Sequence, residues 1–335
     1  MILIASEVFE QHVTPPGHPE RPERAHVFDV VAGDWKAGGG KVIEPRPATL
    51  EELGLAHAEG YVESIMRTRG HAVMLDEDTF TSPESADIAL LAAGAAVQAA
   101  AHAADSGEAA FALVRPPGHH AERARAMGFC LFNNVAVAAA AMLQRGLSRI
   151  AVVDIDVHHG NGTQWIFYDD PRVLYISTHQ YPFYPGTGAA DEIGKGEGTG
   201  FTVNVPLEAG CTDADYALVY TTVVAPVLHE YAPELVIVSA GYDAHERDPL
   251  ASMRLSAAGY ASVAKTIRDA AVAHGQLAVA TEGGYDLPAL AECLKATIET
   301  IEGRPPTSES GGRAARGERA VAAARAALKP FWRAI

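Results

Sequence analysis

The stretch IAVVDIDVHHGNGT at residues 150–163 decides the fold class. It opens with a mainly apolar, β-branched run, IAVVDI (150–155), which predicts a strand buried on both faces. Polar residues and two glycines follow at once, as expected where a strand ends and a loop begins. Strands of this kind are typical of a parallel sheet that is covered by helices.

Five further short runs have the same character, and longer alanine-rich segments separate them. They are ILIAS (2–6), FALV (111–114), VLYIST (173–178), LVIVSA (235–240) and QLAVAT (276–281). Strands that alternate with helices predict an α/β fold, an open parallel sheet with helices on both faces, in a single domain over residues 1–335. Residues 303–319, rich in Gly, Ser, Pro and Arg, predict a flexible loop before a short terminal helix at about 320–329.

Composition narrows the range of partners. The 335 residues contain 26 Lys and Arg against 42 Asp and Glu, a formal charge of −16, which disfavours nucleic acid and anionic membranes and can attract cationic substrates. The stretch richest in apolar residues, 88–104, is mostly alanine and is interrupted by Gln98 and His102, so it predicts a buried helix rather than a membrane span. The first residues, MILIASEVFE, lack the features of a secretory signal, and a cytoplasmic protein is expected.

The three cysteines predict reduced thiols. Cys130, Cys211 and Cys293 lie far apart and form no CxxC pair, so the sequence suggests neither a disulfide framework nor a thiolate metal site. The oligomeric state has no signature in the sequence.

Chemically active residues follow four of the predicted strands. In open α/β sheets the ligand crevice lies beyond the carboxyl ends of the strands. The sequence places RPPGHH (115–120), DVHHGNGT (156–163), GYDAH (241–245) and EGGYD (282–286) there. We therefore expect His, Asp and Tyr side chains from four loops to meet in one crevice.

Asp154, Asp156 and His158 predict a metal site. Alternate side chains of an extended chain point the same way, so these three leave the strand on a common face. Asp243 adds a carboxylate from another strand end. Two aspartates and one histidine with an open fourth position suit catalytic zinc, and ferrous iron fits almost as well. A single Asp-x-His pair is usually a capping aspartate or a core histidine, and the surrounding motifs favour the metal.

The tandem His119 and His120 supply a candidate general base and its companion, on a turn that Pro116, Pro117 and Gly118 stiffen. A surface loop is the alternative for such a pair. Tyr285, after two glycines, has a hydroxyl suited to donating to a developing oxyanion.

Six motifs, in this order, resemble the successive signatures of histone deacetylases and acetylpolyamine amidohydrolases. They are RPPGHH (115–120), GFCLFNN (128–134), VDIDVHHGNGT (153–163), YPGTG (184–188), SAGYDAH (239–245) and EGGY (282–285). The resemblance runs from HPERPER (18–24) to Tyr285, and HPERPER and LDEDTF (75–80) are more similar to bacterial, class II-like members than to class I deacetylases. It implies an arginase/deacetylase-like fold and a zinc-dependent hydrolase that removes acyl groups from acyl-lysine or similar amines.

The resemblance also assigns roles to residues. Zinc would bind Asp156, His158 and Asp243, and His120 would act as general base and then acid beside His119. Asp154 would orient His119. Asn161, behind His120, departs from the aspartate of class I enzymes, and a neutral amide there predicts a less basic His120. Tyr285 would donate to the acyl oxygen.

Substrate and ion contacts follow from the same resemblance. Phe129 and Tyr184 would face each other across a narrow tunnel, Gly128 would let the substrate approach, and Asp78 would hold a peptide's backbone amides; ordinary core aromatics and a capping aspartate are the alternatives. Leu255 would occupy the rim position where a polyamine-selective relative has glutamate, which favours acyl-lysine. A potassium ion would bind at Asp154, Asp156, His158, Ser177 and Thr178. Arg24 would line an acetate channel, with a surface salt bridge as the alternative.

Three other functions stay open on the sequence alone. The first is an acetylpolyamine or other small-amide hydrolase with the same chemistry and a different rim. The second is a non-catalytic module that binds acyl-amines, although a pure binder has no use for a general base. The third is a binuclear manganese hydrolase such as arginase, which shares the broad fold but needs a second set of carboxylates that we do not find in the sequence.

Overall fold

The computed structural model describes residues 1–273, 275–304 and 312–335. At its centre lies an eight-stranded sheet in the order β2-β1-β5-β10-β9-β6-β7-β8, in which every pairing is parallel. Its strands are β1 Ile2–Ile4, β2 Lys41–Ile43, β5 Ala110–Ala112, β6 Ile150–Asp154, β7 Val173–Gln180, β8 Thr202–Leu207, β9 Leu235–Ala240 and β10 Gln276–Thr281. A separate antiparallel hairpin joins β3 (Val73–Met74) and β4 (Phe80–Thr81).

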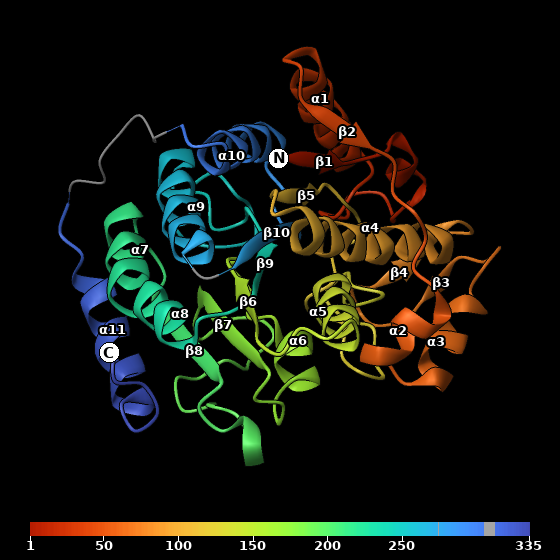
Figure 1. Cartoon of the computed structure of the whole chain (residues 1–335). Coiled ribbons are helices and arrows are strands. Elements are labelled where there is room, and N and C mark those ends of the chain that lie inside the picture. The colour runs from red at the N-terminus through yellow and green to blue at the C-terminus, as the bar shows by residue number, and fades with distance from the viewer. Residues whose placement is uncertain (274, 305–311) are drawn as a thin grey trace.

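Helices cover both faces of the sheet (Figure 1). One layer contains α1 Glu23–Ala37, α7 Asp213–Val219, α8 Ala225–Tyr231, α9 Ala257–Val272, α10 Leu287–Ile301 and α11 Ala315–Leu328. The other contains α2 Leu50–Ala56, α3 Glu59–Met66, α4 Ser85–Ser106 and α5 Asn134–Gln144. Short segments complete the chain: α6 Asn161–Ile166, η1 Glu7–Gln11, η2 Gly196–Gly198 and η3 Tyr220–Val224.

The two faces of the strands supply two hydrophobic cores. In β9, Val236 and Val238 pack in one core, whereas Leu235 and Ile237 pack in the other. Side chains alternate along a strand, so a strand covered on both sides must be apolar throughout. The predicted fold class, an open parallel sheet with helices on both faces, is confirmed.

Helix α4 is long and apolar enough to span a bilayer, but 72% of its most apolar stretch is buried inside the fold. It covers the run 88–104 that predicted a buried helix, and that prediction is confirmed. The single-domain organisation stays a prediction.

The predicted loop at 303–319 needs a correction. Residues 305–311 lie outside the described part of the chain, but α11 begins at Ala315, not at about 320. Its first turn packs on α7, where the backbone N–H of Gly317 donates to Asp215 Oδ1 at 2.7 Å. This tertiary contact extends the helix into a segment whose composition predicts a loop.

Candidate metal and catalytic site

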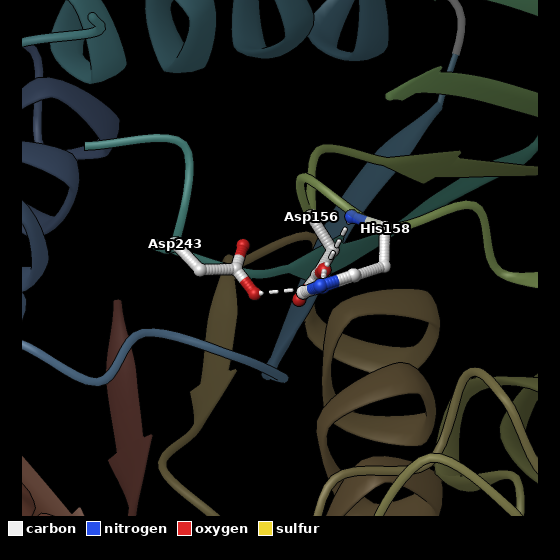
Figure 2. Close-up of side chains that lie close together, drawn as sticks. All are labelled: Asp156, His158 and Asp243. Carbon is white, nitrogen blue, oxygen red and sulfur yellow. Dashed lines mark hydrogen bonds and ion pairs between the residues drawn. The ribbon is translucent and has the colours of Figure 1, made fainter. Parts of the chain in front are cut away.

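The predicted metal ligands lie together beyond the ends of two neighbouring strands. Asp156 and His158 follow β6, and Asp243 follows β9. All three are buried, and one ligand atom from each lies within 4.8 Å of the others. Nδ1 of His158 is 3.1 Å from Oδ1 of Asp156 and 3.2 Å from Oδ2 of Asp243 (Figure 2).

The electrostatics of this group suit a cation. Burial and the neighbouring charge of Asp156 raise the pKa of Asp243 to about 7. Two buried carboxylates are costly unless a positive charge compensates them. Two oxygens and one nitrogen facing a common point form a donor set that fits zinc, and ferrous iron also accepts it.

Glycines leave room for the two carboxylates. A Cβ atom on Gly241 would lie 1.9 Å from Oδ2 of Asp156, and one on Gly283 would lie 2.2 Å from Oδ2 of Asp243. Backbone groups fix the same side chains, because Gly283 N–H donates to Asp156 Oδ2 and Val157 N–H donates to Asp243 Oδ1, both at 2.9 Å. The ligand set is therefore oriented by the fold.

His119 and His120 lie beside this set on the loop after β5, with ring centroids 4.0 Å apart. Nδ1 of His119 is 3.0 Å from Oδ2 of Asp154, as the resemblance implies. Burial lowers the pKa of His119, but Asp154 and Asp156 outweigh it and raise that pKa to about 10. Burial and the charges of His119 and His158 hold the pKa of His120 well below its usual range.

The partner of His120 determines which ring nitrogen has the proton. Oδ1 of Asn161 lies 2.8 Å from Nδ1 of His120, and Nδ2 of Asn161 donates to Oε1 of Glu122 at 2.8 Å. Because Glu122 can only accept in its ionised form, it turns the amide oxygen towards His120, whose Nδ1 must then donate. The lone pair of neutral His120 is left on Nε2.

A narrow tunnel of about 90 Å³ leads to these groups. Its walls include Asp78, Gly128, Phe129, Tyr184 and Tyr285, all expected from the sequence, together with both histidines of the tandem, His158, Pro117 and Leu250. The ring of Tyr184 stands edge-on to that of His120, at 5.2 Å between centroids.

Leu255 does not lie at the rim, so that prediction was wrong. It is 1% exposed and packs in the hydrophobic core. Leu250, five residues earlier in the same loop, lines the tunnel instead. Ala244 and Leu255 are joined by a backbone hydrogen bond of 3.1 Å, which draws Leu255 inward towards α9.

Phe129 is held in an uncommon conformation. Its φ of 69° lies in the left-handed region, which costs about 1–2 kcal/mol for a residue with a side chain. Its N–H donates to Oγ1 of Thr79 at 3.1 Å, and its ring stands 4.6 Å from that of His18. Gly128 has no side chain because a Cβ would lie 2.4 Å from the ring of His120.

Tyr285 is buried at the tunnel wall and is supported from behind. Its N–H donates to Oδ2 of Asp248 at 2.7 Å, and the guanidinium of Arg24 lies 5.1 Å from its ring centroid.

Arg24 is fully buried, so the surface salt bridge considered for it was wrong; it pairs internally with Glu20 at 3.0 Å.

Glu282 also fixes the tandem histidines and was not expected from the sequence. Its Oε2 accepts hydrogen bonds from the backbone N–H groups of Gly118 at 2.6 Å and His119 at 3.1 Å. Its Oε1 accepts from the Ser239 hydroxyl at 2.7 Å. Burial raises the pKa of Glu282 to about 7. The glutamate of the EGGY motif thus ties the loop after β5 to the end of β10.

Of the residues predicted to bind potassium, Asp154 ends β6, Asp156 and His158 follow it, and Ser177 and Thr178 lie within the neighbouring strand β7. Oδ1 of Asp154 accepts from the N–H of Asp156 at 3.2 Å. The hydroxyl of Ser177 is 2.9 Å from Nδ1 of His179, and that of Thr178 is 2.9 Å from the hydroxyl of Tyr220.

Comparison with known proteins identifies the family. Residues 18–301 match the histone deacetylase domain. The chain belongs to the histone deacetylase family. It is 42% identical over 291 residues to a probable deacetylase of Archaeoglobus fulgidus, a match covering 85% of this chain and 81% of that protein. The predicted enzyme class, a deacylase, is confirmed.

Two further histone deacetylase relatives extend the comparison. The human polyamine deacetylase HDAC10 is 40% identical over 313 residues, covering 88% of this chain but 46% of that protein. The crystal structure of the HDA15 HD domain superposes with a TM-score of 0.92 at 36% identity, covering 99% of this chain and 94% of that one. The arginase/deacetylase-like fold is thereby confirmed.

Proposed function

We propose that this chain is a zinc-dependent deacylase that hydrolyses the amide of N-acetyl-lysine or a similar acyl-lysine within a polypeptide. The observation that supports this most directly is the meeting of three groups at the end of one narrow tunnel. These are the ligand set Asp156, His158 and Asp243, the free Nε2 of His120, and the side chain of Tyr285.

Zinc held by Asp156, His158 and Asp243 would supply Lewis-acid chemistry, which lowers the pKa of water to about 7 and polarises a carbonyl. Ferrous iron accepts the same donor set and is the alternative ion.

The residues of the chain then move the protons. Neutral His120 accepts a proton at Nε2 from the attacking water, and it later gives this proton to the departing amine. His119, held in its charged form by Asp154, offsets the negative charge that develops nearby. The Tyr285 hydroxyl donates to the acyl oxygen as that oxygen becomes negative. Water thus adds to the acyl carbon, the carbon–nitrogen bond breaks, and His120 returns to its neutral form.

The walls of the tunnel favour a methylene chain that ends in an amide. Phe129 and Tyr184 both line the tunnel and supply aromatic surface, which suits an apolar stem. Asp78 lies at the mouth, where its carboxylate can accept from peptide N–H groups. Leu250 at the mouth offers no charge to the distal ammonium of a polyamine, which favours acyl-lysine over acetylpolyamine.

Several finer features remain part of this proposal. Potassium would bind behind the metal site, at backbone or carboxylate oxygens of Asp154, Asp156, His158, Ser177 and Thr178. Arg24 would meet the released acetate. The three buried free cysteines fit a cytoplasmic protein, and the acidic charge argues against nucleic acid and anionic membranes as partners.

The test is turnover of an acetyl-lysine peptide and of acetylated putrescine and spermidine by the purified chain. Release of acetate from the peptide, with slower release from the polyamines, is the expected result. A reversed preference would support the polyamine alternative. Tight binding of the peptide without turnover, in protein shown to contain one metal per chain, would favour the non-catalytic binding module.

A further inference from the structure

An apolar groove lies beside the β3–β4 hairpin. It has a volume of about 530 Å³, and its walls include Val13, Pro15, Val73, Met74, Phe80 and Pro83. Val13 is 52% exposed and Met74 is 68% exposed, so two large apolar side chains that line this groove face solvent. Contiguous exposed apolar surface of this kind marks a contact site.

The groove is continuous with the mouth of the tunnel. The turn of the hairpin places Asp78 in the tunnel wall. His18 joins the two regions, because its Nε2 lies 3.0 Å from the backbone oxygen of Asp78 and its ring stands 5.8 Å from that of Phe80. A further cavity of about 490 Å³ lies between them; it shares Thr14 and Pro15 with the groove, and Leu250 and Tyr285 with the tunnel.

We propose that this groove binds an apolar side chain of a polypeptide substrate while the acyl-lysine of the same polypeptide occupies the tunnel. The inference rests on the proposed deacylase function and specifies its substrate. An acetylated polyamine has no side chain to place in the groove, so binding in the groove would favour acyl-lysine polypeptides over acetylated polyamines.

The size of the hairpin limits the spacing between the two side chains. Asp78 follows Met74 by four residues, and an extended chain advances about 3.3 Å per residue, so the two lie at most about 13 Å apart. An extended substrate covers that distance in about four residues. The apolar side chain therefore lies within about four residues of the acyl-lysine.

The charges around the groove favour a basic substrate. Residues 76–84 contain four carboxylates, Asp76, Glu77, Asp78 and Glu84, and no lysine or arginine. Asp76 is paired with Arg125 at 2.9 Å, whereas Glu77 and Glu84 are exposed. A segment that combines one apolar side chain with lysine or arginine neighbours matches this surface.

The test uses nonapeptides with a central acetyl-lysine and serine elsewhere, in which a single leucine is moved through the flanking positions. Acetyl-lysine with both ends blocked serves as the minimal substrate. We expect leucine at one or two positions to raise kcat/KM about tenfold above the all-serine peptide, which corresponds to about 1.4 kcal/mol. Met74→Ser should reduce this preference to about twofold and leave turnover of the minimal substrate unchanged.

Val272→Ser is the matched control. Val272 is also an apolar side chain, 67% exposed, but it lies on α9 and outside the groove. This variant should keep the full preference for leucine.

Several results would overturn the proposal. If the minimal substrate is turned over but leucine at no position raises kcat/KM, the groove does not bind the substrate, and the deacylase function still stands. A preference that survives in a Val13→Ser/Met74→Ser variant would place the apolar contact elsewhere. A concentration-dependent dimer that Met74→Ser abolishes would make a second copy the occupant. Absence of turnover on every substrate, with the metal bound, would contradict the proposed function and this inference with it.

Discussion

Replacing Asn161 by aspartate would show how the side chain behind His120 sets the pKa of that ring. In Asn161→Asp a carboxylate oxygen would take the place of the amide oxygen that lies 2.8 Å from Nδ1 of His120. A carboxylate at this distance raises the pKa of an imidazole by about 1–3 units. The second carboxylate oxygen would face Glu122, which now accepts from the amide at 2.8 Å. Because that repulsion weakens ionisation of the new aspartate, we expect a shift of about one unit, or about 1.4 kcal/mol.

The sign of the effect follows from the role of His120. A general base works in its neutral form, so a higher pKa leaves less of it active at low pH. The acidic limb of kcat/KM for an acetyl-lysine peptide should therefore move upward by about one pH unit in Asn161→Asp. The assay is the pH profile of kcat/KM for wild type and variant, loaded with the same metal.

Glu122→Gln supplies the control. It removes the charge behind the amide but keeps an oxygen that can accept from Asn161. In the double variant Asn161→Asp/Glu122→Gln no neighbouring carboxylate opposes ionisation of the new aspartate. The acidic limb of the kcat/KM profile should therefore move to higher pH than in the single variant. An acidic limb that stays in place in both variants would refute the assignment of His120 as the titrating base.

Three further predictions concern the metal, the oxyanion donor and a buried ion pair. Asp243→Asn should lose metal on dialysis while wild type retains it, as metal analysis would show, because one of two ligand carboxylates becomes neutral. Tyr285→Phe should lower kcat about 10²–10³-fold, or about 2.7–4 kcal/mol, with little change in KM, and near-normal turnover would exclude Tyr285 from the reaction. Burial alone would raise the pKa of Glu20, but the paired Arg115 lowers it from its usual 4.5 to about 2. Ionised Glu20 therefore stabilises the fold by about 3 kcal/mol above pH 4.5, and this contribution is lost as the pH falls towards 2. In Glu20→Gln the free energy of unfolding, measured with urea, should no longer show this decrease between pH 4.5 and 2. The variant should also be less stable than wild type by about 3–5 kcal/mol at pH 7, because Arg115 would keep an unpaired buried charge.

The central strands could be predicted from sequence because burial on both faces demands apolar residues throughout. All six predicted runs correspond to strands of the sheet. Two strands of this sheet were missed, β2 and β8, and both lie at its edges; the separate β3–β4 hairpin was missed as well. β2 is three residues long and only partly buried, and β8 contains Asn204 and Pro206, which interrupt the apolar pattern. Low burial leaves a weak pattern in β2, whereas β8 is buried at five of its six positions and was missed only because of its polar and proline residues, which an edge strand tolerates.

Some residues of the site could be predicted from the sequence in the same way, and others could not. His119, Asp156, His158 and Asp243 follow predicted strands, and the geometry of a parallel sheet is sufficient to bring them together. The supporting residues depend on contacts that no local pattern reveals. Glu282 reaches the backbone of His119 across 163 positions of sequence. Leu250 and Leu255 cannot be told apart by composition, because only the path of their loop determines which one faces the tunnel.

The most direct test of the account is hydrolysis of an acetyl-lysine peptide before metal removal, after treatment with a chelator, and after zinc is restored, in wild type and in Asp243→Asn. The account predicts that wild type loses acetate release with the chelator and recovers it with zinc, while the variant stays inactive at the same zinc concentration. Undiminished release from metal-free protein, or full recovery of the variant, would contradict a metal-dependent reaction at Asp156, His158 and Asp243.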